Sequence, residues 1–206
     1  MPAELLAKLG LVAGVATASG LRLYATVAVL GFLHRLEVVR LPAALEVLGQ
    51  TPIIAIAGVL YVVEFVADKI PAFDSVWDSV HTFIRTPAAA VLAFAAFGQV
   101  AEPWRTGAAL LCGAVALSSH ALKAGSRLAI NASPEPFSNW AASFSEEFLV
   151  LGLIWLAVTH PIAALVVALL TLLAAVLLAS WIVRLARRAF ARRRAAPAAS
   201  PATRGT

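Results

Sequence analysis

Two clusters of small residues, each followed by an arginine, lie within apolar stretches of this chain. The first is Ala18-Ser19-Gly20-Leu21-Arg22, and the second is Ala124-Gly125-Ser126-Arg127. A charge at the centre of a bilayer costs roughly 2.5–3.5 kcal/mol on insertion scales, so it generally has a partner or a purpose. The two clusters predict breaks in membrane helices around a polar centre, where Arg22 and Arg127 would set the local electrostatics.

Acidic side chains end a second apolar stretch. Glu64 and Asp68 are one helical turn apart on one face, and Lys69 follows directly. Carboxylates at a membrane edge can hold a hard cation or exchange protons, because their oxygens replace lost water. In the plainer alternative, Asp68 and Lys69 only end the helix in water, and Glu64 forms a salt bridge with Arg22.

Residues 72–86 are predicted to form an amphipathic helix, either lying in the membrane interface or entering a protein-lined cavity. Pro71 and Pro87 mark its expected ends. Its polar face carries four side chains at helical spacing: Asp74, Asp78, His81 and Arg85. Because Asp-x-x-His can place two metal ligands on one side of a helix, a divalent cation could bind among Glu64, Asp68, Asp74, Asp78 and His81.

A third polar group begins at Lys123 and extends to Asn139. Two prolines flank Glu135, which predicts a rigid, non-helical turn. The segment could bind an anion or a lipid phosphate, or it could only cap helices. The candidate transport or binding residues of the whole chain are therefore Arg22, Glu64, Asp68, Lys69, Asp74, Asp78, His81, Lys123, Arg127, Asn131, Glu135, Asn139 and Glu147.

The composition indicates an all-α integral membrane protein. The 206 residues are 61% hydrophobic and 13% charged, with a mean hydropathy of +0.89, whereas an average soluble domain is about 25% charged. Residues 1–183 are predicted to form one transmembrane domain, and residues 184–206 a basic, disordered cytoplasmic tail. The domain contains about six apolar segments, at 9–33, 53–67, 87–101, 106–122, 144–159 and 162–183.

The distribution of lysine and arginine predicts that both termini are cytoplasmic, because most of these residues then lie inside. The arginines after residue 183 are expected to contact anionic lipid, not nucleic acid. Gly10 and Gly14 allow close helix packing, within the chain or in a homo-oligomer.

Residues 5–101 and 106–183 could be 3+3 repeats with interrupted helices. Because each half would have three spans, an odd number, the second half would cross the membrane in the opposite orientation to the first, which makes the repeats inverted. Each half has an arginine cluster, and each has a Glu-Phe pair, at Glu64 and at Glu147. Inverted repeats with interrupted helices are typical of secondary transporters.

Three motifs resemble a bacterial integral membrane family catalogued as domain of unknown function 4126. They are Glu64-Phe-Val-Ala-Asp-Lys-Ile-Pro71, Asp74-Ser-Val-Trp-Asp-Ser-Val-His-Thr-Phe-Ile-Arg85 and Asn131-Ala-Ser-Pro-Glu-Pro-Phe-Ser-Asn139. The likeness covers roughly residues 9–183 and implies a bacterial inner-membrane location, but the family name implies no activity. Glu64-x-x-x-Asp-Lys69 is also similar to the Glu-x-Gly-Asp-Lys signature of manganese/calcium–proton exchangers, with a longer spacing and no glycine.

These features favour a transporter or channel-like protein for a small ion or polar solute. A lipid-binding or lipid-phosphate-processing protein is one alternative, and a non-transporting membrane scaffold is another. No nucleophile–base pattern, glycine-rich phosphate loop or Cys/His zinc motif supports an enzyme, and no cofactor other than a divalent cation is suggested.

Overall fold

The computed structural model describes residues 2–132 and 136–195, and every regular element in them is a helix. Five helices are long and apolar enough to cross a membrane, or six if η1 and α3, which meet at 65°, form one bent span. This confirms the all-α fold with about six spans. The elements are α1 (Pro2–Leu21), α2 (Leu23–Arg35), η1 (Ala43–Gly49), α3 (Thr51–Ala67), α4 (Pro71–Ala96), α5 (Glu102–Asn131), α6 (Pro136–Thr159) and α7 (Pro161–Ala195).

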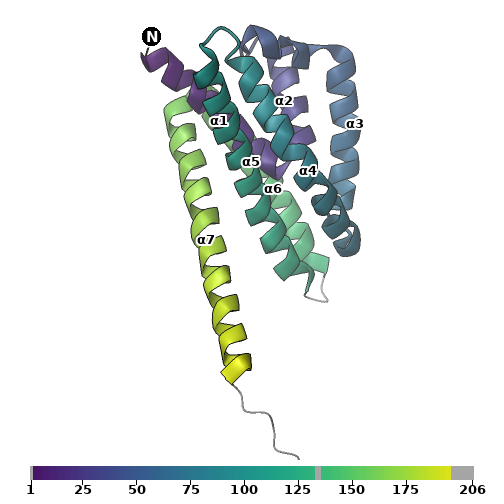
Figure 1. Cartoon of the computed structure of the whole chain (residues 1–206). Helices are drawn as coiled ribbons and strands as arrows, with labels where there is room; N and C mark the ends of the chain where they lie inside the picture. The colour runs from purple at the N-terminus through teal and green to yellow at the C-terminus, as the bar shows by residue number, and fades with distance from the viewer. Residues whose placement is uncertain (1, 133–135, 196–206) are drawn as a thin grey trace, which may run out of the picture.

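The predicted break at Arg22 is present. Arg22 has extended backbone angles (φ −145°, ψ 96°) between α1 and α2, and α2 turns back toward the end where α1 begins (Figure 1). The apolar segment 9–33 is therefore a helical hairpin with Arg22 at its tip, not one continuous span. The hairpin tip reaches the interior of the bundle.

Helix α1 is the centre of the bundle, in contact with α4, α5, α6 and α7. Its glycines make this possible, since a Cβ atom on Gly10 would collide with the Pro161 carbonyl, and one on Gly14 with Ala157 and Ala164. A Cβ on Gly20 would collide with Ser119 and Ala116 of α5. The small residues of α1 thus serve packing within the chain, and a homo-oligomer stays a prediction.

The expected amphipathic helix at 72–86 and the apolar segment at 87–101 are one continuous helix, α4. Pro71 begins it as predicted, but Pro87 lies inside it and does not end it. Apolar side chains such as Val76 and Phe83 face outward, while the polar face is buried against the rest of the protein. The alternative in which that polar face meets bulk water is wrong.

The predicted second break, at Ala124–Arg127, is also wrong, because α5 runs without interruption through it. A glycine inside a helix costs only about 1 kcal/mol relative to alanine, and the packing of α5 against α4 and α1 offsets that cost. One of the two features that related the halves is therefore lost, and the inverted repeat stays a prediction.

Helix α7 extends to Ala195, so the expected disorder is wrong for residues 184–195. Residues 196–206, and Glu135 with its neighbours 133–134, lie outside the described part of the chain. The beginning of α1 and the end of α7 lie at opposite ends of the bundle (Figure 1).

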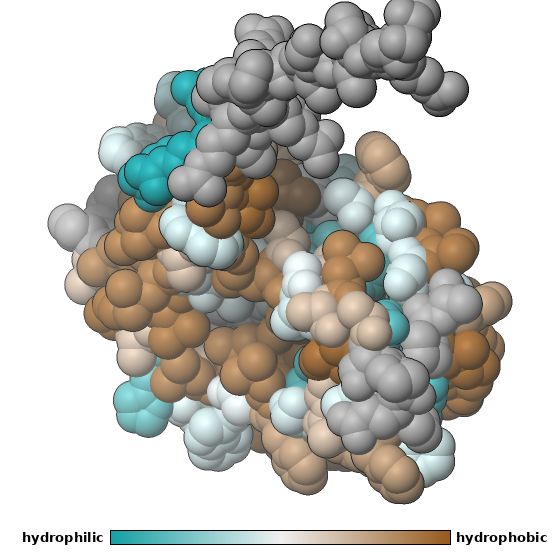
Figure 2. Space-filling view, turned by 90° about the horizontal axis from the view of Figure 1, so that it is seen from below, coloured by the Kyte–Doolittle hydropathy of each residue, from teal (hydrophilic) through white to brown (hydrophobic). Residues whose placement is uncertain are grey.

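The outer surface is largely apolar, as expected of helices that face acyl chains. Seen from the end where α7 finishes, hydrophobic residues make up most of the rim, and hydrophilic residues appear in smaller areas among them (Figure 2). Most of the described candidate site residues lie inside the bundle.

Candidate functional site

A network of ten charged side chains lies inside the half of the bundle into which the hairpin tip reaches. None is more than 16% exposed, and eight have 6% exposed side-chain area or less. The side chains come from the hairpin tip and from α3 to α6, together with the residue that follows α3. We call this set the charge network: Arg22, Glu64, Asp68, Asp74, Asp78, Arg85, Lys123, Arg127, Glu146 and Glu147.

Arg22 connects the hairpin tip to α6 and to the end of α3. Its Nη2 lies 2.8 Å from Asp68 Oδ2 and 3.4 Å from Glu146 Oε2, and its Nη1 lies 3.3 Å from Glu147 Oε1. Nη2 also donates to the carbonyl and the hydroxyl of Ser143, at 3.2 and 3.1 Å. An extended residue between two helices thus presents its guanidinium to three carboxylates.

Two cations of α5 complete the ring around Asp68. Lys123 Nζ lies 3.1 Å from Asp68 Oδ2, and 3.5–3.6 Å from Asp78 and Glu146. Arg127 forms a two-pronged pair with Glu146, at 2.8 and 2.9 Å, and also binds the backbone and side chain of Asn139. Burial alone would raise the pKa of Asp68, but its three cationic neighbours lower the pKa below its ordinary value.

Arg85 forms a second centre on α4. Its Nη2 lies 2.5 Å from Glu64 Oε1, and its Nη1 donates to the Gly20 carbonyl at the hairpin tip, at 3.2 Å. Glu64 therefore pairs with Arg85, and the predicted pair with Arg22 is wrong. Asp68 lies one helical turn after Glu64, and it is Asp68 that contacts Arg22. Glu64, one turn earlier on α3, contacts Arg85 instead.

His120 links Arg85 to the wall of a cavity. The Arg85 Nη1 donates to His120 Nδ1, at 2.8 Å, so this ring nitrogen accepts and the proton of a neutral ring is on Nε2. Nε2 then donates toward the Asp78 carbonyl, at 3.0 Å, and lies 2.7 Å from the Thr82 hydroxyl.

A polar cavity of about 90 Å³ opens between α4 and α5 beside the network. It is large enough for several water molecules, and its wall contains carboxylate, guanidinium and hydroxyl groups. Its lining residues are Ser75, Asp78, Ser79, Thr82, Ala124, Arg127 and Leu128.

Three predicted site residues lie at the edge of the network. Lys69 is half-buried, with its ammonium 2.9 Å above the centre of the Phe65 ring and 3.4 Å from the Ser143 hydroxyl. His81 stacks on Trp77 and donates through Nδ1 to the Trp77 carbonyl, so its Nε2 accepts from the Tyr24 hydroxyl at 3.1 Å. Asn131, at the end of α5, binds Asp74.

The predicted divalent-cation site does not form. Among the described residues, no group of three or more His, Cys, Asp or Glu side chains is placed to hold a metal ion. The five proposed ligands are separated because each has another partner: lysine or arginine for Glu64, Asp68 and Asp78, Asn131 for Asp74, and Tyr24 for His81.

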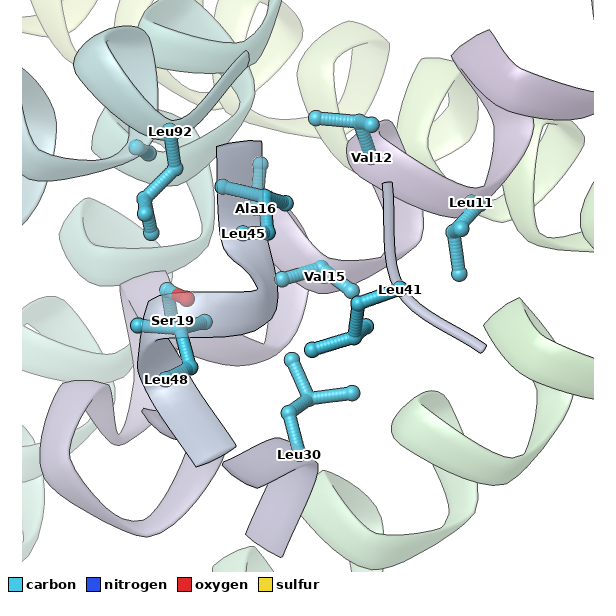
Figure 3. Close-up of a pocket in the computed structure, with 11 residues that line it drawn as sticks. Leu11, Val12, Val15, Ala16, Ser19, Leu30, Leu41, Leu45, Leu48 and Leu92 are labelled. Carbon is cyan, nitrogen blue, oxygen red and sulfur yellow. The ribbon is translucent and has the colours of Figure 1, made fainter. Parts of the chain in front are cut away.

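The other half of the bundle is apolar. A cavity of about 20 Å³ lies between α1, α2, η1 and α4, and the Ser19 hydroxyl is the one polar side chain among those that line it (Figure 3). Leucines from the hairpin and η1, among them Leu30, Leu45 and Leu48, converge there. Apolar packing therefore separates the charge network from the end of the bundle where α1 begins.

The sequence analysis missed Glu146 and Ser143, and it left Arg85 and His120 out of the predicted site. Glu146 directly precedes the predicted Glu147 and is the better-paired of the two carboxylates. Two adjacent glutamates in an apolar helix are a signal in themselves, because at least one must have a buried partner. His120 lies one turn before Ala124 on the helix that carries Lys123 and Arg127.

The family described as "Domain of unknown function (DUF4126)" matches residues 9–181. The chain belongs to this family. The match covers all of the charge network, so the network lies within the domain that defines the family. Comparison with curated proteins and with solved structures finds no match.

Proposed function

We propose that this member of the DUF4126 family is a membrane transporter or channel-like protein for a small ion or polar solute. The observation that carries the proposal is the charge network at the tip of an interrupted helix. Broken helices that place charged groups inside a membrane protein are typical of substrate and coupling-ion sites in secondary transporters. A network that only held the helices together would need fewer charged residues, because buried ion pairs often stabilise a protein no more than apolar packing does.

The cavity between α4 and α5 gives the network an entrance. Asp78 and Arg127 belong to both the network and the cavity wall. The leucine-lined region at the other end is the closed side of the pathway in this conformation. Transport would then require that this apolar contact opens when the network changes its charge or ligand.

The positive residues suggest which end is cytoplasmic. Lys69 and the arginines at the end of α7 lie at the end nearest the network, which the positive-inside rule assigns to the cytoplasm. The beginning of α1 would then lie outside. Cysteines at Ala3 and Arg188, both exposed, should be labelled by a membrane-impermeant reagent from opposite sides, while Cys112, fully buried, should not react. Labelling of both from one side would contradict this orientation.

A flux assay in liposomes tests the function. Purified protein should give uptake of protons, monovalent or divalent cations, or a small polar metabolite above empty liposomes, and Asp68→Asn should reduce the rate by at least about tenfold, which corresponds to about 1.4 kcal/mol. Glu46→Gln, which changes an exposed carboxylate, is the matched control and should transport normally. No uptake of any of these solutes would contradict the proposal.

The lipid-phosphate alternative loses its proposed ligands. Lys123 and Arg127 are 3% and 2% exposed and point inward to Asp68 and Glu146, so they do not present a phosphate site to the membrane. An apolar groove of about 470 Å³ lies between α2, α3 and α4. It would accept an acyl chain, as any such groove in a membrane does, so it does not favour a lipid-processing function over the others.

A further inference from the structure

Asp74 differs from the other carboxylates of the charge network in having no cation. Among the described residues, each of the other five acidic side chains lies within 4 Å of a lysine or arginine. No described lysine or arginine forms an ion pair with Asp74. Its side-chain hydrogen-bond partner among these residues is neutral, because the Asn131 amide donates to Oδ2 at 2.9 Å.

The second oxygen of Asp74 has no hydrogen-bond partner in the part of the chain that the structure describes. Oδ1 is buried, and the residue as a whole is 0% exposed. A buried carboxylate without a cation is costly as an anion, and such groups commonly become protonated instead. The carboxyl oxygen that no donor reaches is the one that has space for a proton.

The numbers of acidic and basic side chains in the network also single out Asp74. Six carboxylates face four cations, Arg22, Arg85, Lys123 and Arg127, so the network has more acids than it can pair. Glu64 and Asp68, which the sequence suggested for proton exchange, are held by their cations. Of the six, Asp74 is the carboxylate that forms no ion pair among the described residues.

We infer that the proton is an ion that this network binds and releases, and that Asp74 is the carboxyl group that carries it. The inference rests on the proposed function and names its coupling ion. A hydronium ion on the network side loses one O–H bond and becomes water as its proton forms an O–H bond with Asp74 Oδ1, and the reverse step returns the proton to water. Ser75, the next residue in the chain, and Asp78, one turn further along α4, form part of the wall of the polar cavity.

The geometry favours a proton over a metal ion. Calcium takes six to eight oxygen ligands and magnesium six, and the described residues offer no group of three acidic or histidine ligands. The charged groups whose electrostatic fields act on Asp74 are Arg127 on α5, Asp68 after α3 and Asp78 on α4, and Arg127 forms its ion pairs with Asp68 and Glu146.

Infrared spectroscopy of the full protein in lipid bilayers tests the inference directly. A carboxylic-acid carbonyl band that shifts in heavy water should be present on the acid side of a pH titration and should disappear as the pH rises. Asp74→Asn, which keeps the shape of the side chain, should remove it. Glu46→Gln should leave it unchanged, and a spectrum of Asp74→Asn identical to that of the unaltered protein would overturn the inference.

A second variant gives an independent readout and covers the case in which Asp74→Asn does not fold. Asn131→Leu removes the amide that stabilises the anion, so the same band should persist to higher pH. An unchanged titration in this variant would also overturn the inference.

Flux measurements separate this inference from the proposed function. If the band behaves as described but no solute is transported, the proton site stands and the transport proposal fails. If transport occurs without the band and without dependence on a proton gradient, the transport proposal stands and the proton site fails.

Discussion

The two halves of the bundle use opposite means to hold the same hairpin. Near the beginning of α1, the hairpin packs through leucines and valines around a cavity of about 20 Å³ with one hydroxyl. At its tip, Arg22 and the Gly20 carbonyl bind a network of buried charges. A membrane protein does not need charge to pack helices, because small residues and close contact suffice. The contrast therefore supports the proposal that the charged half carries the function and that the apolar half serves packing.

The largest expected effect is the loss of Asp68, which lies between three cations. Asp68→Ala should lower the free energy of unfolding by about 3–5 kcal/mol, because it leaves buried charges without compensation. Reversible unfolding in detergent micelles measures this, with Glu46→Gln as control. A cost below about 1 kcal/mol would show that the network is hydrated and loosely held.

Truncation in the apolar half should cost less. Leu30, 2% exposed, loses packing when changed to alanine, and in soluble proteins such a change costs about 2–5 kcal/mol. Because the unfolded helix in lipid keeps an apolar surrounding, we expect Leu30→Ala to lie at or below the lower end of that range. Measured under the same conditions, a cost above that of Asp68→Ala would reverse the comparison.

The partner assignment of Glu64 gives a smaller, more specific test. Glu64→Gln and Arg85→Met should show a coupling free energy of about 0.5–3 kcal/mol in a double-mutant cycle, as expected for residues in contact. Glu64→Gln with Arg22→Met should be more nearly additive, because no contact joins these two side chains. Strong coupling to Arg22 instead of Arg85 would contradict the arrangement.

Lys69, at the edge of the charged half, should matter least. Its ammonium lies over the Phe65 ring and is partly exposed, and a cation–π contact at such a site contributes about 0.5–1 kcal/mol. Lys69→Gln should therefore reduce stability by no more than this amount. A loss comparable to that of Asp68→Ala would place Lys69 inside the network.

Much of the architecture follows from local sequence features. Arg22 in an apolar segment predicted a break and a buried partner, and both are present. The same reasoning failed at Arg127, because a residue inside an intact helix can reach inward as easily as one at a break. Helical spacing on α4 identified its polar face, but it could not show whether that face meets water or protein.

The pairing of charges could not be predicted, because it depends on how helices far apart in the sequence are rotated against one another. Glu64 and Arg22 were reasonable partners by depth, yet Arg85 lies between Glu64 and the hairpin tip. Glu146 was missed because the neighbouring Glu147 matched the first half of the chain better. The positions of acids and bases were visible in the sequence, but their contacts were not.

The decisive experiment compares solute flux in liposomes that contain equal amounts of folded Glu64→Gln or Leu30→Ala protein. It tests whether the buried charges carry transport. The first change keeps the shape of a side chain in the charged half and removes its charge, while the second removes packing from the apolar half. We expect Glu64→Gln to abolish transport and Leu30→Ala to retain it. Equal transport by the two variants would show that the buried charges only hold the helices together.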